Sequence, residues 1–430
     1  MIQHTPIREL SSHIGEVTTI IGFAYIMRKQ SNVAFVVVRD ITGTVQVVFE
    51  KSNEAAFEVV KNLTSESNIK ITGMVKDEPK VKGGVEVLAD SIEILSAAES
   101  ELPLNVYEKN SETAAGVEVR HENRFLDLRR PENTLVIKLR ALLDQCYREY
   151  LTDRGFLETH TPKLMPTPSE SHAELFTLEY FGGKAYLAQS PQLYKQMAIA
   201  AGLEKVFEIG QIFRAEKSFT TRHATETISM DLEMAYIDGA EDLMDLEEDL
   251  LKYFIVSAFE KYGDEIKTYY GIESSVPKFA RITHKEAKQI AGSTDFDEDL
   301  GSEEEKKIGA HFAGLGIDFV FVHTWPAKAR AFYHKRDDNG MSKSADLLYK
   351  GVEITTLAQR EENYEKLVAQ ANDKGFKTDG LQWYLDFFKY GVPPHGGWGI
   401  GAARVVKQLL NIDSIRDTEF IYRGPNKIYP

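Results

Sequence analysis

Residues 205–237, KVFEIGQIFRAEKSFTTRHATETISMDLEMAYI, hold two apolar runs on either side of a charged bend. The runs at 205–212 and 227–237 are rich in β-branched and aromatic residues, which predicts a pair of strands. Near the bend lie two arginines, a histidine and two glutamates: Arg214, Glu216, Arg222, His223 and Glu226. An arginine fork can hold a phosphate and a carboxylate together, and a neighbouring glutamate can accept a hydrogen bond from an adenine amino group. A solvated charged turn is the plain alternative.

The composition is that of a globular protein with two or three domains. The chain has 430 residues, of which 43% are hydrophobic and 27% charged, which is ample for a large buried core. No apolar stretch of about 18 residues is present, so we expect no membrane span. The start of the chain lacks the features of a signal peptide. The single cysteine, Cys146, is expected to be a buried thiol, and a cytoplasmic location fits both observations.

The charge of the chain bears on its partners. A net charge of −15 counts against a protein that coats nucleic acid through overall basic charge. It does not exclude RNA as a partner, because binding needs a local basic surface rather than a basic average.

The first hundred residues predict a five-stranded barrel. Runs bounded by turn residues occur at 17–26, 34–39, 43–49, 68–75 and 84–94, and a helical segment at 54–63 follows the third run. This order is that of an OB-fold, whose face binds single-stranded nucleic acid; a barrel without a ligand is the alternative. We assign 1–100 to this domain, 101–117 to a polar linker and 118–430 to a second domain. In the second domain long helices, such as 135–151 and 241–261, alternate with apolar strands.

Two further segments carry residues suited to chemistry. Asp346 and Glu353 are separated by a short turn, so their carboxylates can share Mg²⁺ on the phosphates of ATP; two unrelated surface acids are the alternative. A glycine-rich strand from 397 runs into a helix at 402–410, where Arg404 in the first turn is placed to stack on a flat base. The glycines mimic a dinucleotide-binding loop. We reject that site, because no clean strand precedes the glycines and no second βαβ unit follows.

The three segments, in this order, resemble the three signature motifs of class II aminoacyl-tRNA synthetases. Residues 155–162, GFLETHTP, resemble the first motif, whose helix, strand and proline build a dimer interface. Residues 213–226 resemble the second motif and 397–404 the third. The segment 124–129, RFLDLR, precedes the first motif as it does in the subgroup for aspartate, asparagine and lysine. The chain looks most like the archaeal and eukaryotic aspartate enzymes of that subgroup. The resemblance implies an α+β fold, in which an OB-fold barrel precedes an antiparallel sheet flanked by helices.

The resemblance also implies a ligase that joins an amino acid to tRNA with ATP and Mg²⁺. The implied catalytic residues are Arg214, His223 and Arg404. The implied ATP-binding residues are Arg214, Glu216, Arg222, His223, Ala224, Glu353, Gly401 and Arg404. The implied metal ligands are Asp346, Glu353 and Thr356. The implied partners are tRNA, aspartate and a second copy of the chain, bound through the first motif around Pro162.

In the barrel, three residues match family positions that contact the anticodon. Phe35 and Gln46 match positions that stack on and hydrogen-bond an anticodon base, and Arg28 is a plausible phosphate or base contact. An inward-facing core position is the alternative for Phe35.

Lys195, in the segment 187–196 (LAQSPQLYKQ), favours aspartate as the amino acid. A β-carboxylate in a dry pocket needs cationic partners, whereas an amide beside a lysine leaves that charge poorly paired. The resemblance implies Lys195 and Arg360 as those partners. The other implied amino-acid-binding residues are Glu170, Gln192 and Asp231 around the substrate ammonium, Arg214 between carboxylate and α-phosphate, and Thr356. An exposed lysine on a helix is the alternative for Lys195.

Several positions near this pocket depart from the family pattern. Leu357 and Ala358 stand where two glycines are usual, and Ala403 stands where an acidic residue usually precedes the arginine of the third motif. Since glycines let a substrate lie against backbone, Leu357 and Ala358 are expected to reduce or reshape the pocket. The alternatives to an aspartate enzyme are a paralogue with another amino acid, for example asparagine, or a tRNA-binding protein that has lost charging.

Overall fold

The structure is a computed structural model that describes residues 2–81, 83–107, 115–166, 175–218, 220–376 and 378–429. The chain divides into two compact units, Met1–Thr134 and Leu135–Pro430. Residues 118–134, which the sequence groups with the second domain, lie in the first unit. They contain α2 (Val117–Glu122), α3 (Arg124–Asp127) and the first residues of α4 (Pro131–Thr152).

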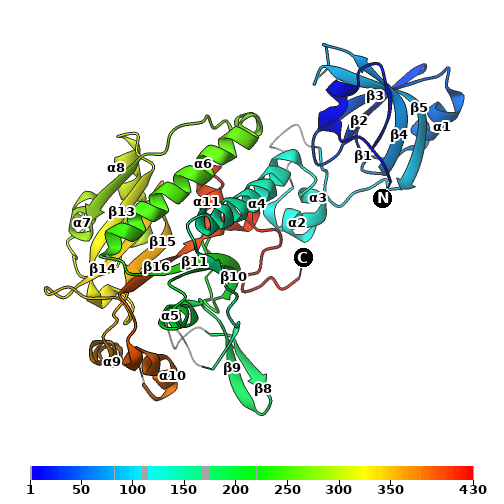
Figure 1. Cartoon of the computed structure of the whole chain (residues 1–430). Helices are drawn as coiled ribbons and strands as arrows, with labels where there is room; N and C mark the ends of the chain where they lie inside the picture. The colour runs from blue at the N-terminus through cyan, green and yellow to red at the C-terminus, as the bar shows by residue number, and fades with distance from the viewer. Residues whose placement is uncertain are drawn as a thin grey trace. The chain divides into compact units, whose positions relative to one another are not determined.

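A closed five-stranded barrel forms the core of the first unit (Figure 1). Its strands are β1 (Val17–Lys29), β2 (Val33–Arg39), β3 (Thr44–Glu50), β4 (Asn68–Asp77) and β5 (Val85–Ser96), and α1 (Glu54–Asn62) joins β3 to β4. The strands close in the order β1-β2-β3-β5-β4. Every predicted strand overlaps its observed counterpart, and the predicted OB-fold is confirmed.

Alternation along β2 shows how the sequence builds the barrel. Ala34, Val36 and Val38 point inward and are buried, while Phe35 between them faces outward and is half-buried. Small and β-branched side chains pack well on the inner, pleated surface. Phe35 is therefore not a core residue, which removes the alternative that the sequence left open.

An eight-stranded sheet forms the centre of the second unit, in the order β12-β13-β14-β15-β16-β11-β10-β6. The strands are β6 (Leu157–Glu158), β10 (Lys205–Phe213), β11 (Glu226–Ala235), β12 (Phe279–Thr283), β13 (Phe319–Pro326), β14 (Met341–Tyr349), β15 (Val352–Gln359) and β16 (His395–Gly401). The pairs β12–β13 and β10–β6 are parallel, and the other neighbours are antiparallel. This confirms the predicted α+β class with a mostly antiparallel catalytic sheet, and β10–β11 is the predicted hairpin.

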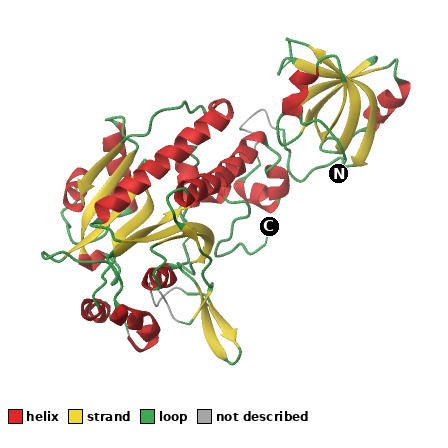
Figure 2. Cartoon of the chain, viewed as in Figure 1, coloured by secondary structure: helices red, strands yellow, loops and turns green. Residues whose placement is uncertain are grey.

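Two long helices, α4 and α6 (Ala240–Tyr270), supply many of the apolar side chains of the main core, together with α11 (Ala402–Leu409). Figure 2 shows these helices and the sheet as separate layers. Among the described residues, the second unit also contains the α-helices α5 (Gln192–Ala200), α7 (His284–Ala291), α8 (Ser302–Ala313), α9 (Tyr364–Asp373) and α10 (Gln382–Leu385). Cys146 on α4 is a buried free thiol, as expected. Among the described residues, no helix combines the length and apolar character needed to cross a membrane.

A smaller sheet of β7 (Leu164–Met165), β8 (Thr177–Tyr180) and β9 (Gly183–Leu187) has the order β7-β9-β8. The β8–β9 hairpin projects from the second unit (Figure 1). Phe181 and Gly182 form its turn, both with positive φ angles.

Glu247 of α6 is a fully buried acid inside the main core of the second unit. Neither of its carboxyl oxygens makes a hydrogen bond of good geometry with the described residues. Burial raises its pKa to about 8, with the Thr355 hydroxyl opposing the shift and the Asp346 charge adding to it. Glu247 is therefore protonated in the folded protein at neutral pH.

The raised pKa of Glu247 makes the stability of the protein depend on pH. Between about pH 4.5 and about pH 8, unfolding releases the Glu247 proton, so the free energy of unfolding falls as the pH rises through that window. We expect Glu247→Gln to remove this loss, which amounts to on the order of 5 kcal/mol across the window. Urea denaturation at both ends of this pH window measures the free energy of unfolding of the wild type and of the variant. Asp249→Asn, at an exposed position of the same helix, is the matched control. Equal pH profiles for wild type and Glu247→Gln would show that Glu247 does not titrate as stated.

Candidate active site

A cavity of about 420 Å³ opens on the large sheet of the second unit. Most of its wall comes from β10, β11 and the loop between them, from β15, and from β16 with the start of α11. Residues in the segments 189–192 and 329–334, together with Arg360 and Ile415, also line it. The cavity thus joins all three segments that the sequence singled out.

Five arginines line this cavity, and three of them, Arg214, Arg222 and Arg404, are called here the arginine group. Arg214 lies just after β10, Arg222 in the loop before β11, and Arg404 in the first turn of α11. The Nη1 of Arg404 donates to the carbonyl oxygen of Glu353 at 2.8 Å. Clustered guanidinium groups favour the binding of a polyanion, because each can donate two parallel hydrogen bonds to phosphate oxygens.

His223 lies among these arginines. Burial lowers its pKa, and the charges of Arg404, Arg214 and Arg222 lower it further. Its Nδ1 lies 3.1 Å from Oγ of Ser218 and 2.5 Å from Oγ1 of Thr220. At neutral pH the ring is therefore uncharged and adds no repulsion to the arginine group.

Glu353 is the carboxylate that lines the cavity beside the arginine group. Its Oε1 accepts a hydrogen bond from Oγ1 of Thr356 at 3.2 Å, and its Oε2 lies 3.9 Å from Nη1 of Arg404. Ala224, Thr356 and Gly401, all predicted at this site, line the same cavity.

Asp346 lies behind this surface and is 5% exposed. Both of its oxygens accept hydrogen bonds from Arg330, at 2.9 and 2.5 Å. Burial raises the pKa of Asp346 to about 7, although Arg330 opposes the shift. Arg330, which the sequence did not single out, lines the cavity.

These contacts decide how well the site suits a metal ion. Among the described residues, no group of three or more His, Cys, Asp or Glu side chains is arranged to hold one. Glu353 presents a carboxylate to the cavity, and Mg²⁺ commonly binds one or two carboxylates together with substrate phosphates. The residues therefore fit Mg²⁺ held by Glu353 and a phosphate ligand. Asp346 could bind the ion only if Arg330 released one of the two Asp346 oxygens from its hydrogen bond.

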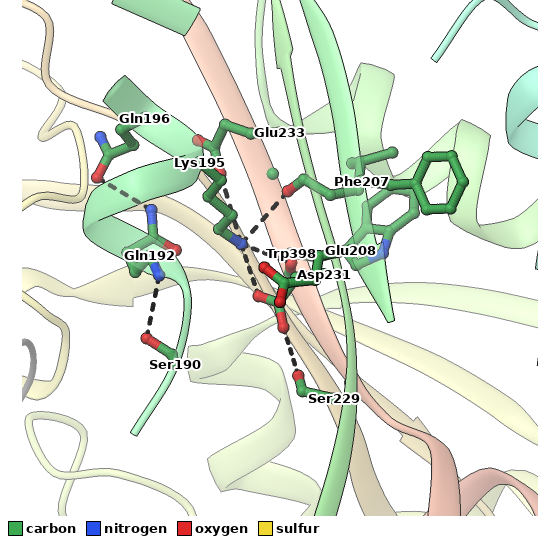
Figure 3. Close-up of polar contacts among 12 residues, drawn as sticks. Ser190, Gln192, Lys195, Gln196, Phe207, Glu208, Ser229, Asp231, Glu233 and Trp398 are labelled. Atoms are coloured by element: carbon green, nitrogen blue, oxygen red, sulfur yellow. Dashed lines mark hydrogen bonds and ion pairs between the residues drawn. The ribbon is translucent and has the colours of Figure 1, made fainter. Parts of the chain in front are cut away.

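Lys195 of α5 is buried, and its ammonium group is surrounded by protein (Figure 3). The Nζ donates to Oδ1 of Asp231 at 2.9 Å, to the Trp398 carbonyl at 2.7 Å and to the Leu232 carbonyl at 3.3 Å. It also lies 3.5 Å from Oε2 of Glu233. Lys195 is not among the cavity-lining residues, whereas Asp231 is. Its charge is thus committed to the protein, and Asp231 stands between it and the cavity.

Arg360 pairs with Glu233 in the same way. Its Nε and Nη2 donate to the two oxygens of Glu233 at 2.9 and 3.3 Å, and Nη2 also donates to the carbonyl of Gly397 and to Oε1 of Gln192. Burial alone would raise the pKa of Glu233, but Arg360 and Lys195 outweigh it and hold that pKa below its usual range. Lys195, Asp231, Glu233 and Arg360 therefore form a charge-balanced group, called here the buried network.

Gly397 of β16 makes room for this network. It pairs with Glu233 across the sheet, and a side chain at this position would collide with the Glu233 carboxylate and the Leu232 carbonyl. The glycine-rich strand that mimics a dinucleotide loop thus serves close packing inside a sheet.

The departures from the family pattern have different outcomes. Leu357 is fully buried in the main core and does not line the cavity, so the expectation that it narrows the pocket is wrong. Alternation along β15 turns Leu357 away from Thr356, which does line the cavity. Ala358 is also fully buried and is not a lining residue. Ala403 lines the cavity, so this change alters its wall.

The remaining predicted residues are placed as follows. Gln192 lines the cavity, Glu216 does not, and Glu170 lies outside the described residues. Sequence reasoning missed Glu233 and Arg330. Glu233 was within reach, because it lies two residues after Asp231 and so shares its strand face. Arg330 offered a weaker signal, because Lys328, Lys335 and Arg336 are within six residues of it and make the segment resemble an ordinary charged stretch.

On the barrel, the three predicted contact residues lie together on the outer face. Arg28 and Phe35 are direct cross-strand partners, and the guanidinium lies 5.8 Å from the ring centre. Nη2 of Arg28 donates to Oε1 of Gln46 at 3.3 Å, and Nε2 of Gln46 donates to Oε2 of Glu86 at 3.0 Å. An aromatic ring beside a cation and an amide is an arrangement that binds unstacked bases.

Comparison with known proteins places this geometry in a family. Residues 116–421 match the tRNA synthetases of class II (D, K and N), and residues 14–95 match the OB-fold nucleic acid binding domain. The chain belongs to this class II synthetase family. Enzymes of this class use ATP, which agrees with the arginine group.

The chain matches relatives over nearly their full length. The chain is 38% identical over 426 residues to the Aspartate--tRNA(Asp/Asn) ligase of Methanopyrus kandleri, covering 97% of this chain and 96% of that protein. It is 38% identical over 410 residues to the Aspartate--tRNA(Asp) ligase of Picrophilus torridus, covering 95% and 96%. Asparaginyl-tRNA synthetase from Pyrococcus horikoshii, complexed with asparaginyl-adenylate, matches with a TM-score of 0.92 and 34% identity over 100% of both chains.

From the ion pairs of the buried network we predict that Lys195 is essential for the stability of the synthetase. Lys195→Leu leaves Asp231 and Glu233 short of a cation, which we expect to cost about 3 kcal/mol of unfolding free energy. Adding Asp231→Asn to Lys195→Leu should recover part of the loss, because one unpaired charge is then gone. Urea denaturation measures both. Lys267→Leu, which breaks an exposed pair with Glu273, is the control and should change little. A Lys195→Leu variant as stable as this control would contradict the pairing.

Proposed function

We propose that this synthetase activates L-aspartate with ATP and transfers it to tRNA. One observation carries the proposal: a single cavity brings the arginine group together with Arg360 and Asp231 of the buried network. The arginine group suits the phosphates of ATP. Arg360 carries hydrogen-bond donors and Asp231 hydrogen-bond acceptors, which suit the carboxylate and ammonium groups of an amino acid. Two ligases that match nearly the full length of the chain are named for aspartate.

The proposed first step forms an aspartyl-adenylate. An α-carboxylate oxygen of aspartate attacks the α-phosphorus of ATP, the bond from that phosphorus to the bridging oxygen breaks, and pyrophosphate leaves. The carboxylate is itself the nucleophile, so the protein supplies no general base. The arginine group stabilises the charge that develops on the phosphoryl oxygens, and it does so best because it is already assembled. The aminoacyl group then passes to a tRNA hydroxyl, and AMP leaves.

Magnesium is part of this proposal. Glu353 is the residue that would hold the ion, in company with phosphate oxygens, while Thr356 orients the Glu353 carboxylate through its hydroxyl. When bound, Mg²⁺ neutralises phosphate charge and helps to orient the phosphates. His223 contributes a neutral hydrogen-bond donor beside the arginines.

Asparagine is the second candidate for the amino acid, and the buried network favours it. The positive charges of Lys195 and Arg360 are already matched by Asp231 and Glu233, so the network offers no net charge to a substrate carboxylate. The close match to an asparaginyl-tRNA synthetase points the same way. Aspartate remains our proposal because of the near full-length relatives named for it.

ATP–pyrophosphate exchange, measured with each amino acid in turn, tests the proposal. We expect exchange with aspartate and only background exchange with asparagine, followed by charging of tRNA. Exchange with asparagine alone would replace aspartate by the second candidate. Exchange with no amino acid, combined with tRNA binding, would instead indicate a protein that has lost charging. Arg214→Gln is the control, and it should abolish exchange with every amino acid.

The barrel supports a role in binding the anticodon. Arg28, Phe35 and Gln46 are side by side on its outer face, and Phe35 is half-buried there rather than packed in the core. A stacked base gains about 1–3 kcal/mol from such a ring.

Phe35→Ala should therefore weaken tRNA charging without touching the adenylation step. We expect the KM for tRNA to rise about tenfold, while ATP–pyrophosphate exchange stays at the wild-type level. Ile41→Ala, at an exposed position of the same unit, should change neither quantity. An unchanged KM for tRNA in Phe35→Ala would refute the stacking role.

A homodimer through the segment around Pro162 belongs to the same proposal. Leu157 of β6 and Leu164 of β7 flank Pro162 and are 51% and 46% exposed. Leu178 and Tyr180 add exposed apolar side chains on the β8–β9 hairpin. Exposed apolar side chains of this kind favour a protein partner, and sedimentation of the wild type as a monomer would contradict the dimer. A cytoplasmic location, testable by cell fractionation, completes the proposal.

A further inference from the structure

α8 reaches the arginine group from outside the three motif segments. Glu305, in the first half of α8, is 7% exposed. Its Oε2 accepts one hydrogen bond from Nη1 of Arg222 at 2.9 Å and another from the backbone N–H of Glu353 at 3.1 Å. A single oxygen atom thus joins the loop before β11 to the start of β15.

The position of α8 is set by backbone packing rather than by long side chains. Gly309 lies directly against Gly351 in the turn between β14 and β15, and a Cβ at Gly309 would collide with it. Gly351 has a φ of 72°, which glycine adopts without strain. The Gly351 carbonyl accepts a hydrogen bond from Nη2 of Arg222 at 3.2 Å, and Ser302 of α8 accepts one from Nη1 at 3.1 Å.

The positive charges near Glu305 explain why its contact with Arg222 matters. Arg222 shares the cavity with Arg214 and Arg404, and three neighbouring cations repel one another before an anion arrives. Burial raises the pKa of Glu305, while Arg222 opposes that shift. The carboxylate compensates Arg222 and, at the same time, holds the backbone next to the Glu353 side chain.

We propose that Glu305 is a positioning residue for ATP, which acts by fixing the Arg222 guanidinium relative to Glu353. The inference rests on the proposed function, since it takes Arg222 and Glu353 as nucleotide-binding residues. It assigns to α8, an element outside the motifs, a part in assembling the phosphate site. The opposite role is a latch, in which Glu305 competes with phosphate for Arg222. The two roles differ in the direction of their effect on ATP affinity.

Glu305→Gln separates these roles, because it keeps the shape of the side chain and removes the charge. For a positioning residue we expect the KM for ATP in pyrophosphate exchange to rise about tenfold, the loss of one charge-assisted hydrogen bond. The KM for the amino acid should stay near the wild-type value. A KM for ATP that falls, or that does not change, overturns the proposal. So does a variant whose ATP and amino-acid KM values rise together.

Two further variants sharpen the test. Glu303→Gln changes a residue of the same helix whose side chain is 80% exposed, and it should leave every parameter unchanged. If Glu305 acts through Arg222, then Arg222→Gln combined with Glu305→Gln should bind ATP no worse than Arg222→Gln alone. Additive losses in that pair contradict the proposed route.

Equilibrium titration with ATP alone accompanies the kinetics. If the wild type showed no exchange with any amino acid, that result would contradict the proposed function itself. If the wild type showed normal exchange and the Glu305→Gln variant had unaltered ATP affinity, only the inference about Glu305 would be contradicted.

Discussion

The buried network of Lys195, Asp231, Glu233 and Arg360 is the constraint on which the rest of the catalytic unit depends. Removing four charges from water carries a large cost, which is offset only if each charge is paired and hydrogen-bonded. Here the partners come from α5, β11, the end of β15 and the carbonyls of β16. The pairs can form only in one register of these elements. The network therefore holds the strands that build the cavity wall in a single arrangement.

The cavity wall contains two different electrostatic environments, the buried network and the arginine group. The buried network is charge-balanced, so it offers directed hydrogen bonds rather than excess charge. The arginine group is less buried, and its cations face the cavity with fewer protein anions to match them. A polyanion gains most from the second environment and an amino acid from the first. His223, kept neutral by burial and by the arginines, avoids further repulsion.

The departures from the family pattern show how differently neighbouring positions are constrained. Leu357 and Thr356 are adjacent in sequence, yet one belongs to the main core and the other lines the cavity. An apolar side chain at 357 is accommodated by the core. Ala403, in contrast, alters the cavity wall next to Arg404, which keeps its contact with the Glu353 carbonyl. The position of a substitution on the strand or helix, more than its distance from a motif, decides whether the site changes.

The sequence by itself determined the barrel, the β10–β11 hairpin and eleven of the 26 residues that line the cavity. Period-two alternation and turn residues are local signals, so they survive without knowledge of the fold. Only the tertiary structure decided that Lys195 stands behind Asp231, that Arg330 binds Asp346, and that Glu305 reaches Arg222. Each of these contacts joins residues far apart in the chain. Glu305 is one of three consecutive glutamates, Glu303, Glu304 and Glu305, which read alike as a solvated helix face. The packing of Gly309 against Gly351 turns one of them inward, and that choice depends on backbone contacts that no local pattern encodes.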